Sequence, residues 1–91
     1  MFLNIGLNYL IDRKHIVGIY DIETTTGSAV TKQFLTKAQK ENRVVAVAPE
    51  LPRSFIVYEE NGKTTVYLSQ FSTATLQKRN RNETIPLWEE K

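Results

Sequence analysis

Residues 55–69 read FIVYEENGKTTVYLS, in which two apolar runs flank the dipeptide Asn61–Gly62. Asparagine and glycine tolerate positive φ, so this dipeptide favours the tight turn whose twist matches that of the adjoining strands. Counting outward from the turn gives the expected cross-strand pairs Glu60 with Lys63, Val57 with Val66, and Phe55 with Leu68. The sequence therefore predicts an antiparallel hairpin.

Four shorter segments predict further strands. Leu3 and Ile5 alternate with Asn and Gly, and residues 10–11 are apolar, which predicts two short strands within the first dozen residues. Residues 16–22 place apolar side chains on both sides of an extended chain, so we expect a strand that is largely buried on both faces. Residues 44–47 form another short apolar run and predict a strand as well.

A long helix is expected between the third and fourth of these strands. Val30, Phe34 and Ala38 recur every four residues and form one apolar stripe, which predicts an amphipathic helix over about residues 28–41. The hydroxyl groups of residues 24–28 can cap its first turn by accepting from backbone N–H groups that lack a partner within the helix.

A short C-terminal helix is expected over about residues 73–80. Ser72 precedes it as a cap, and Leu76 is its main apolar anchor. Residues 83–91 are expected to form a tail in which Trp88 carries a large apolar area.

These elements predict a small α+β domain. Its expected core is a mostly antiparallel sheet of about six short strands with the two helices. The 91 residues leave room for one hydrophobic core, so residues 1–82 are expected to form a single domain. A core of this size typically leaves a monomer marginally stable, which makes oligomerisation one way to gain stability.

The composition restricts the cellular setting. The chain has no cysteine, which rules out disulfides and thiolate metal sites and fits a reducing compartment. The N-terminal residues lack the pattern of a secretory signal, and no apolar run approaches the roughly 20 residues of a membrane helix. We therefore expect a cytoplasmic protein with no membrane partner.

No combination of residues predicts catalysis, a cofactor or a metal site. His15 is the only histidine and lies in a charged turn, where an exposed or hydrogen-bonded role is expected rather than a catalytic one. Glu59 and Glu60 are adjacent on a strand and point to opposite faces, so they are expected to be solvated. The glycines are scattered and form no phosphate-binding loop. We expect a protein that is not an enzyme.

Basic residues provide the candidate binding sites. The net charge of +2 is too small to indicate a polyanion partner, so the distribution of charge matters more. Arginine offers phosphates a planar fork and lysine a mobile point charge. The candidate nucleic-acid-binding residues are Arg13, Lys14 and His15 in the early turn, Arg53 after a proline, and Lys78 and Arg79 at the end of the last helix.

Four segments of the sequence resemble the RemA/RemB family of extracellular-matrix regulators. They are FLNIG at residues 2–6, HIVGIYD at 15–21, PRSFIV at 52–57, and the ending from LS at 68–69 to STATLQKR at 72–79. The likeness covers roughly residues 1–80 in one register and leans toward the RemB branch. Their order and spacing carry the resemblance.

This resemblance implies a bacterial cytoplasmic regulator of biofilm matrix genes that binds DNA. It also implies that small subunits assemble into a ring whose rim carries arginines. The family's arginine at the end of the early turn falls on His15, and its paired arginines before the fifth strand fall on Glu50 and Leu51. Only Arg53 is basic in that second region.

Two hypotheses of different classes follow. The first is a homo-oligomeric regulator that binds double-stranded DNA through a patch of Arg13, Lys14 and Arg53, repeated around the assembly. The alternative, motivated by Glu50 and Leu51, is an oligomeric protein–protein interaction module that does not bind DNA. A third class, a small-molecule sensor or enzyme, would require an enclosed polar pocket.

Overall fold

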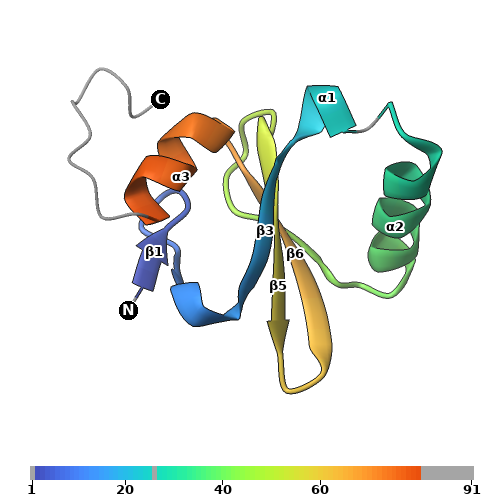
Figure 1. Ribbon diagram of the computed structural model, residues 1–91, viewed down its shortest axis with the longest axis horizontal. Coiled ribbons are helices and arrows are strands. Elements are labelled where there is room, and N and C mark those ends of the chain that lie inside the picture. The colour runs from blue at the N-terminus through green and yellow to red at the C-terminus, as the bar shows by residue number, and fades with distance from the viewer. Residues whose placement is uncertain (1, 26, 81–91) are drawn as a thin grey trace.

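The computed structural model describes residues 2–25 and 27–80 (Figure 1). Its elements are β1 (Phe2–Asn4), β2 (Leu10–Asp12), the 3-10 helix η1 (Arg13–His15), β3 (Ile16–Asp21), α1 (Ile22–Thr25), α2 (Ala29–Lys40), β4 (Val44–Ala46), β5 (Ser54–Glu60), β6 (Lys63–Ser69) and α3 (Thr73–Asn80). Strands β1 and β2 form one sheet, and the other four form a second sheet in the order β3–β5–β6–β4. The predicted α+β class and mostly antiparallel pairing are confirmed, with the six strands divided between two sheets.

Figure 1 shows the four-stranded sheet in the middle of the molecule, with β1 and α3 on one side and α2 on the other. The expected C-terminal tail, residues 83–91 with Trp88, lies outside the described residues. Within the described part of the chain, no helix is long and apolar enough to cross a membrane.

The β5–β6 hairpin has the predicted register. The expected pairs Glu60 with Lys63, Val57 with Val66, and Phe55 with Leu68 all lie opposite one another. Asn61 and Gly62 have φ angles of 53° and 78°, which is the left-handed conformation that the two-residue turn requires at both positions. The hairpin is therefore determined by local chemistry, and β3 and β4 pair with its outer edges.

Strand β3 differs from the expectation of burial on both faces. Its pairing with β5 shifts between Ile16 and Gly18, so Val17 is an extra residue in a bulge and is 60% exposed. Strand β3 is also at the edge of its sheet, with no strand covering its outer side. The prediction was wrong because alternation along the chain reports neither a bulge nor an edge position.

The end of the predicted strand is also different. Ile22 begins the short helix α1 instead of ending β3, and the backbone N–H of Thr24 donates to the carboxylate of Asp21 at 3.0 Å. This capping contact turns the chain away from the sheet at the point where the apolar pattern continues.

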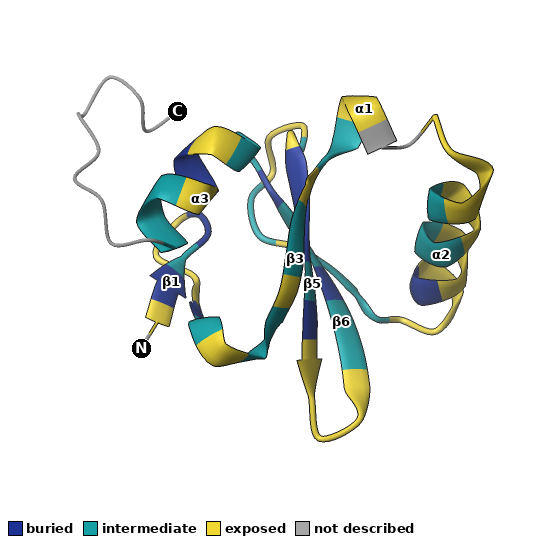
Figure 2. Ribbon diagram, in the orientation of Figure 1, coloured by how far each residue is buried: buried dark blue, intermediate teal, exposed yellow. Residues whose placement is uncertain are grey.

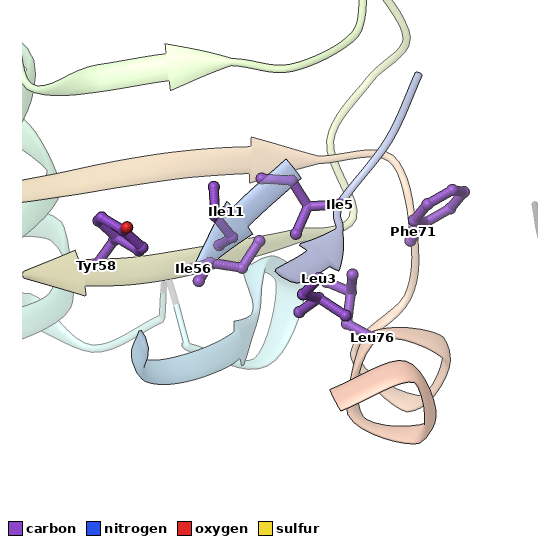
Figure 3. Packing of buried hydrophobic residues seen from close by; sticks show 7 residues of the cluster. All are labelled: Leu3, Ile5, Ile11, Ile56, Tyr58, Phe71 and Leu76. Carbon is purple, nitrogen blue, oxygen red and sulfur yellow. The ribbon is translucent and has the colours of Figure 1, made fainter. Parts of the chain in front are cut away.

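Strand β5 carries two separate cores, one on each face of the sheet. Ile56 and Tyr58 belong to a cluster with β1, β2 and α3, whose buried members are Leu3, Ile5, Ile11, Ile56, Tyr58, Phe71 and Leu76 (Figure 3). Phe55 faces the other way and packs with Val66 and Ala38. Figure 2 shows the buried positions concentrated along β5 and at the contacts of the flanking elements.

Helix α2 spans Ala29–Lys40, close to the predicted range, but its apolar stripe is only partly buried. Ala38 is fully buried, and Phe34 and Leu35 pack beside it, whereas Val30 is 76% exposed. Ser28 occupies the N-cap position, but its hydroxyl makes no capping hydrogen bond, so the predicted side-chain cap is wrong. The helix is held by its C-terminal half, and its first turn has little contact with the sheet.

Helix α3 agrees with its prediction at both ends. The backbone N–H of Thr75 donates to the Ser72 hydroxyl at 3.2 Å, which satisfies one of the free donors of the first turn. Leu76 is completely buried in the cluster with β1 and β2. The helix therefore lies against the small sheet, with its C-terminal residues beside the segment that follows β2.

Two buried serines connect the sheet to its surroundings. Ser54 and Ser69 are opposite each other in β5 and β6 and have no exposed surface. The Ser54 hydroxyl donates to the carbonyl of Phe71 at 2.8 Å. The Ser69 hydroxyl donates to the carbonyl of Ile5 at 2.6 Å and accepts from the N–H of Phe71 at 3.1 Å. Ser69 thereby joins β6 both to the loop after β1 and to the start of α3.

We predict that Ser69→Ala lowers the free energy of unfolding by about 1–3 kcal/mol, because it leaves a buried carbonyl and a buried N–H without their partner. Ser28→Ala is the matched control, since that hydroxyl makes no capping bond, and it should cost less than about 0.5 kcal/mol. Urea unfolding of both variants measures the difference. Equal losses in the two variants would contradict the role given to Ser69.

Three tyrosines form a cluster between the two sheets. The ring centroids of Tyr9 and Tyr67 are 5.5 Å apart, and those of Tyr58 and Tyr67 are 5.6 Å apart in an edge-on arrangement. Burial raises the pKa of Tyr67 to about 12, and the neighbouring phenols of Tyr9 and Tyr58 act in the same direction. Tyr67 therefore prefers to stay protonated in the folded protein.

The free energy of unfolding should fall between pH 10 and about pH 12. In this interval the unfolded chain releases the Tyr67 proton at its ordinary pKa near 10, whereas the folded protein retains it. Chemical denaturation at several pH values should show that the free energy of unfolding of Tyr67→Phe falls less steeply between pH 10 and about pH 12 than that of the unmodified protein. Identical pH profiles would show that Tyr67 does not contribute.

Candidate nucleic-acid interface

The early basic turn is the 3-10 helix η1. Asp12 caps it by accepting from the backbone N–H of Lys14 at 3.2 Å, and this hydrogen bond lowers the pKa of the Asp12 carboxyl. The Lys14 ammonium lies 3.8 Å from the same carboxylate, yet its side chain remains 72% exposed. An exposed pair at this distance holds the lysine weakly, so Lys14 can also contact an external anion.

Arg13 joins η1 to the last turn of α3. Its Nε donates to the side-chain oxygen of Asn80 at 3.1 Å, across 67 positions of sequence. Arg13, Gln77 and Asn80 line a polar hollow of about 230 Å³ together with residues 16–19 of β3. This contact brings the early turn and the C-terminal basic run, which are far apart in the sequence, to one place on the molecule.

Lys78 and Arg79 belong to this last turn of α3 and are both half-buried. The guanidinium carbon of Arg79 lies 4.7 Å from the centroid of the Phe71 ring, a distance typical of a cation–π contact. Cations also suit the negative end of the helix dipole. We call Arg13, Lys14, Lys78 and Arg79 the basic cluster.

His15 is packed rather than presented to solvent. Its ring meets the edge of the Tyr58 ring at a centroid distance of 5.5 Å, and its Nε2 lies 3.5 Å from a carboxylate oxygen of Glu60. These contacts anchor η1 against β5. The structure therefore gives His15 a positioning role for the turn that carries Arg13 and Lys14.

Arg53 lies apart from the other candidates. It precedes β5, where its N–H donates to the carbonyl of Ser69 and its carbonyl accepts from the N–H of Ile22. His15 lies beside the opposite end of β5, next to the pair Ile16–Tyr58. Arg53 and Tyr58 are separated by five steps of extended chain, which is roughly 16 Å at about 3.3 Å per residue. Arg53, whose side chain is exposed, thus lies at the other end of β5 from the turn that carries Arg13 and Lys14.

Asn80 and Gln77 belong to this site without having been predicted from the sequence. They are three positions apart on α3, a spacing that places both on one helix face, but nothing in the sequence indicated that Arg13 would meet that face. Within residues 2–25 and 27–80, no three histidine, aspartate or glutamate side chains come together as metal ligands would. The chemistry available here is that of cations and amides, which bind anions.

Comparison with known proteins identifies relatives over nearly the whole chain. A family model described as RemA-like, extracellular matrix regulatory protein A-like, matches residues 2–79. Extracellular matrix regulatory protein B of Bacillus subtilis (strain 168) is 30% identical over 79 residues, which cover 87% of this chain and 89% of that protein. The chain therefore belongs to the RemA-like family of extracellular matrix regulatory proteins.

Proposed function

We propose that this protein is a cytoplasmic, non-enzymatic regulator that binds double-stranded DNA as a homo-oligomer. The observation that carries the proposal is the Arg13–Asn80 hydrogen bond, because it holds η1, with Arg13 and Lys14, against the last turn of α3, which also contains Lys78 and Arg79. Membership of a family of matrix regulatory proteins supports a role in controlling matrix genes. The lack of cysteine fits the reducing interior of the cell.

The basic cluster is suited to phosphate groups rather than to base edges. Lys14 is exposed, Arg13 places its positive charge beside the hollow, and Asn80 and Gln77 add amide groups. Such contacts position a protein on the duplex, whereas base contacts provide sequence specificity. A net charge of +2 on one subunit gives weak attraction, so repetition of the cluster in an oligomer would supply the affinity.

Lys14→Ala should weaken binding to duplexes of any sequence by a similar factor. It should also make the slope of log K against log salt concentration shallower by about 0.9 for each phosphate group that the variant no longer neutralises. Fluorescence anisotropy with a labelled duplex, titrated at several salt concentrations, measures both quantities. Lys78→Ala should behave in the same way.

Lys63→Ala is the matched control, because Lys63 is an exposed lysine at the tip of the β5–β6 hairpin and outside the basic cluster. It should leave the salt slope unchanged. Absence of duplex binding at low salt, or equal effects of Lys14→Ala and Lys63→Ala, would refute the proposed interface.

An alternative function, a protein–protein interaction module that does not bind DNA, is favoured by one feature. Leu51 is 89% exposed in the connection between β4 and β5 and stands beside Glu50, so this loop offers an apolar and acidic surface ahead of Arg53. The anisotropy titration separates the two functions, since this module would leave the duplex free at every salt concentration.

A further inference from the structure

The polar hollow beside η1 lies against β3, the edge strand of the main sheet. Residues 16–19 of β3 form part of its lining, and Arg13, Gln77 and Asn80 form the rest. Val17 lies in the bulge of this strand and is 60% exposed. A strand edge without a neighbour has backbone groups that can pair with a further segment of chain. The hollow therefore offers cationic, amide and apolar groups together.

The C-terminal segment, residues 81–91, begins at this hollow. Its sequence RNETIPLWEEK directly follows Asn80, which lines the hollow and accepts from Arg13. Trp88 is eight residues beyond Asn80, which corresponds to roughly 26 Å of extended chain at about 3.3 Å per residue. The six residues of β3 span roughly 20 Å on the same scale. The segment is therefore long enough to cross the hollow and to follow β3.

The charge of the C-terminal segment is opposite to that of the basic cluster. The segment has three acids and two bases, a net side-chain charge of −1; they are Arg81, Glu83, Glu89, Glu90 and Lys91. Glu83 is three residues beyond Asn80, so it is within roughly 10 Å of the residue that accepts from Arg13. Lys14, with a side chain that is 72% exposed, is accessible to the more distant acids.

The apolar residues of the segment lie between its acids. They are Ile85, Leu87 and Trp88, and Trp88 is the only tryptophan of the chain. A tryptophan has a large apolar area to bury, and Val17 gives the hollow an exposed apolar side chain. Because the segment is tethered to α3, its effective concentration at the hollow is on the order of millimolar, so even a weak contact is populated.

We propose that the C-terminal segment binds the polar hollow of its own subunit and covers the basic cluster. Glu83 pairs with Arg13, Trp88 packs on Val17, and the last two acids face Lys14. The carboxylates then take the positions that phosphate groups require, so the segment and a DNA duplex exclude each other. The proposal rests on the proposed function and adds its regulation, because DNA has to displace the segment from the cluster.

The fluorescence of Trp88 tests the contact without DNA. In the unmodified protein, Trp88 should be protected from quenching by acrylamide. Val17→Asp should increase the quenching and shift the emission to longer wavelengths, because it places a negative charge where the indole packs. Val30→Asp is the matched control, since it changes an exposed valine that lines a different hollow, and it should leave Trp88 protected. Circular dichroism verifies that both variants fold.

Three results of this comparison would overturn the contact. They are a solvated Trp88 in the unmodified protein, exposure of Trp88 by Val30→Asp instead of Val17→Asp, and protection that is lost on dilution. The last result would assign the segment to a second copy of the chain.

Duplex titrations test the regulation. Glu83→Gln should tighten duplex binding by about threefold or more, as expected if the segment occupies the cluster in about two thirds of the free molecules. Glu59→Gln is the matched control, because it removes one exposed carboxylate from the β5–β6 hairpin, and it should have a smaller effect. Saturating duplex should also make Trp88 accessible to acrylamide.

Equal effects of Glu83→Gln and Glu59→Gln, or a Trp88 that stays protected in saturating duplex, would overturn the regulation and leave DNA binding intact. A protein that binds no duplex would refute the proposed function and the regulation together. The quenching comparison of Val17→Asp with Val30→Asp is made without DNA, so it decides the contact in either case.

Discussion

The central constraint in this molecule is that β5 has to supply both of its cores. Its alternating side chains place Ile56 and Tyr58 on one face and Phe55 on the other, and each face has its own small hydrophobic cluster. In a chain of 91 residues, neither cluster can be large. The β5–β6 hairpin therefore has to form in one register, since a slip of one residue would exchange the two faces.

Different elements pack against the two faces of the four-stranded sheet, and this difference determines which residues are left at the surface. On one face, β1, β2 and α3 pack closely, which brings Arg13 to Asn80 and so assembles the basic cluster. On the other face, α2 packs against β4, β6 and the Phe55 side of β5, while Tyr20 and Val30 remain exposed. The proposed anion-binding cluster thus lies with the first face, while the second face keeps an apolar groove lined by Tyr20, Val30 and Phe55.

The features predicted correctly from sequence are those set by neighbours in the chain. Asn61–Gly62 determines the hairpin register, and Ser72 with Leu76 determines where α3 begins and which side it buries. The predictions that were wrong concern features that are determined by tertiary contacts rather than by neighbours in the chain. The bulge at Val17 and the exposure of Val30 depend on strand order and on which elements meet. Alternation and helical periodicity carry no information about these.

The most direct test of the proposed function is the mass of the protein in solution with and without duplex DNA. At low salt, analytical ultracentrifugation should show an assembly of several subunits that sediments together with an added labelled duplex. Raising the salt concentration should release the duplex while the assembly persists, because phosphate contacts are more sensitive to salt than apolar subunit contacts. A monomer whose mass is unchanged by DNA at low salt would contradict a DNA-binding homo-oligomer.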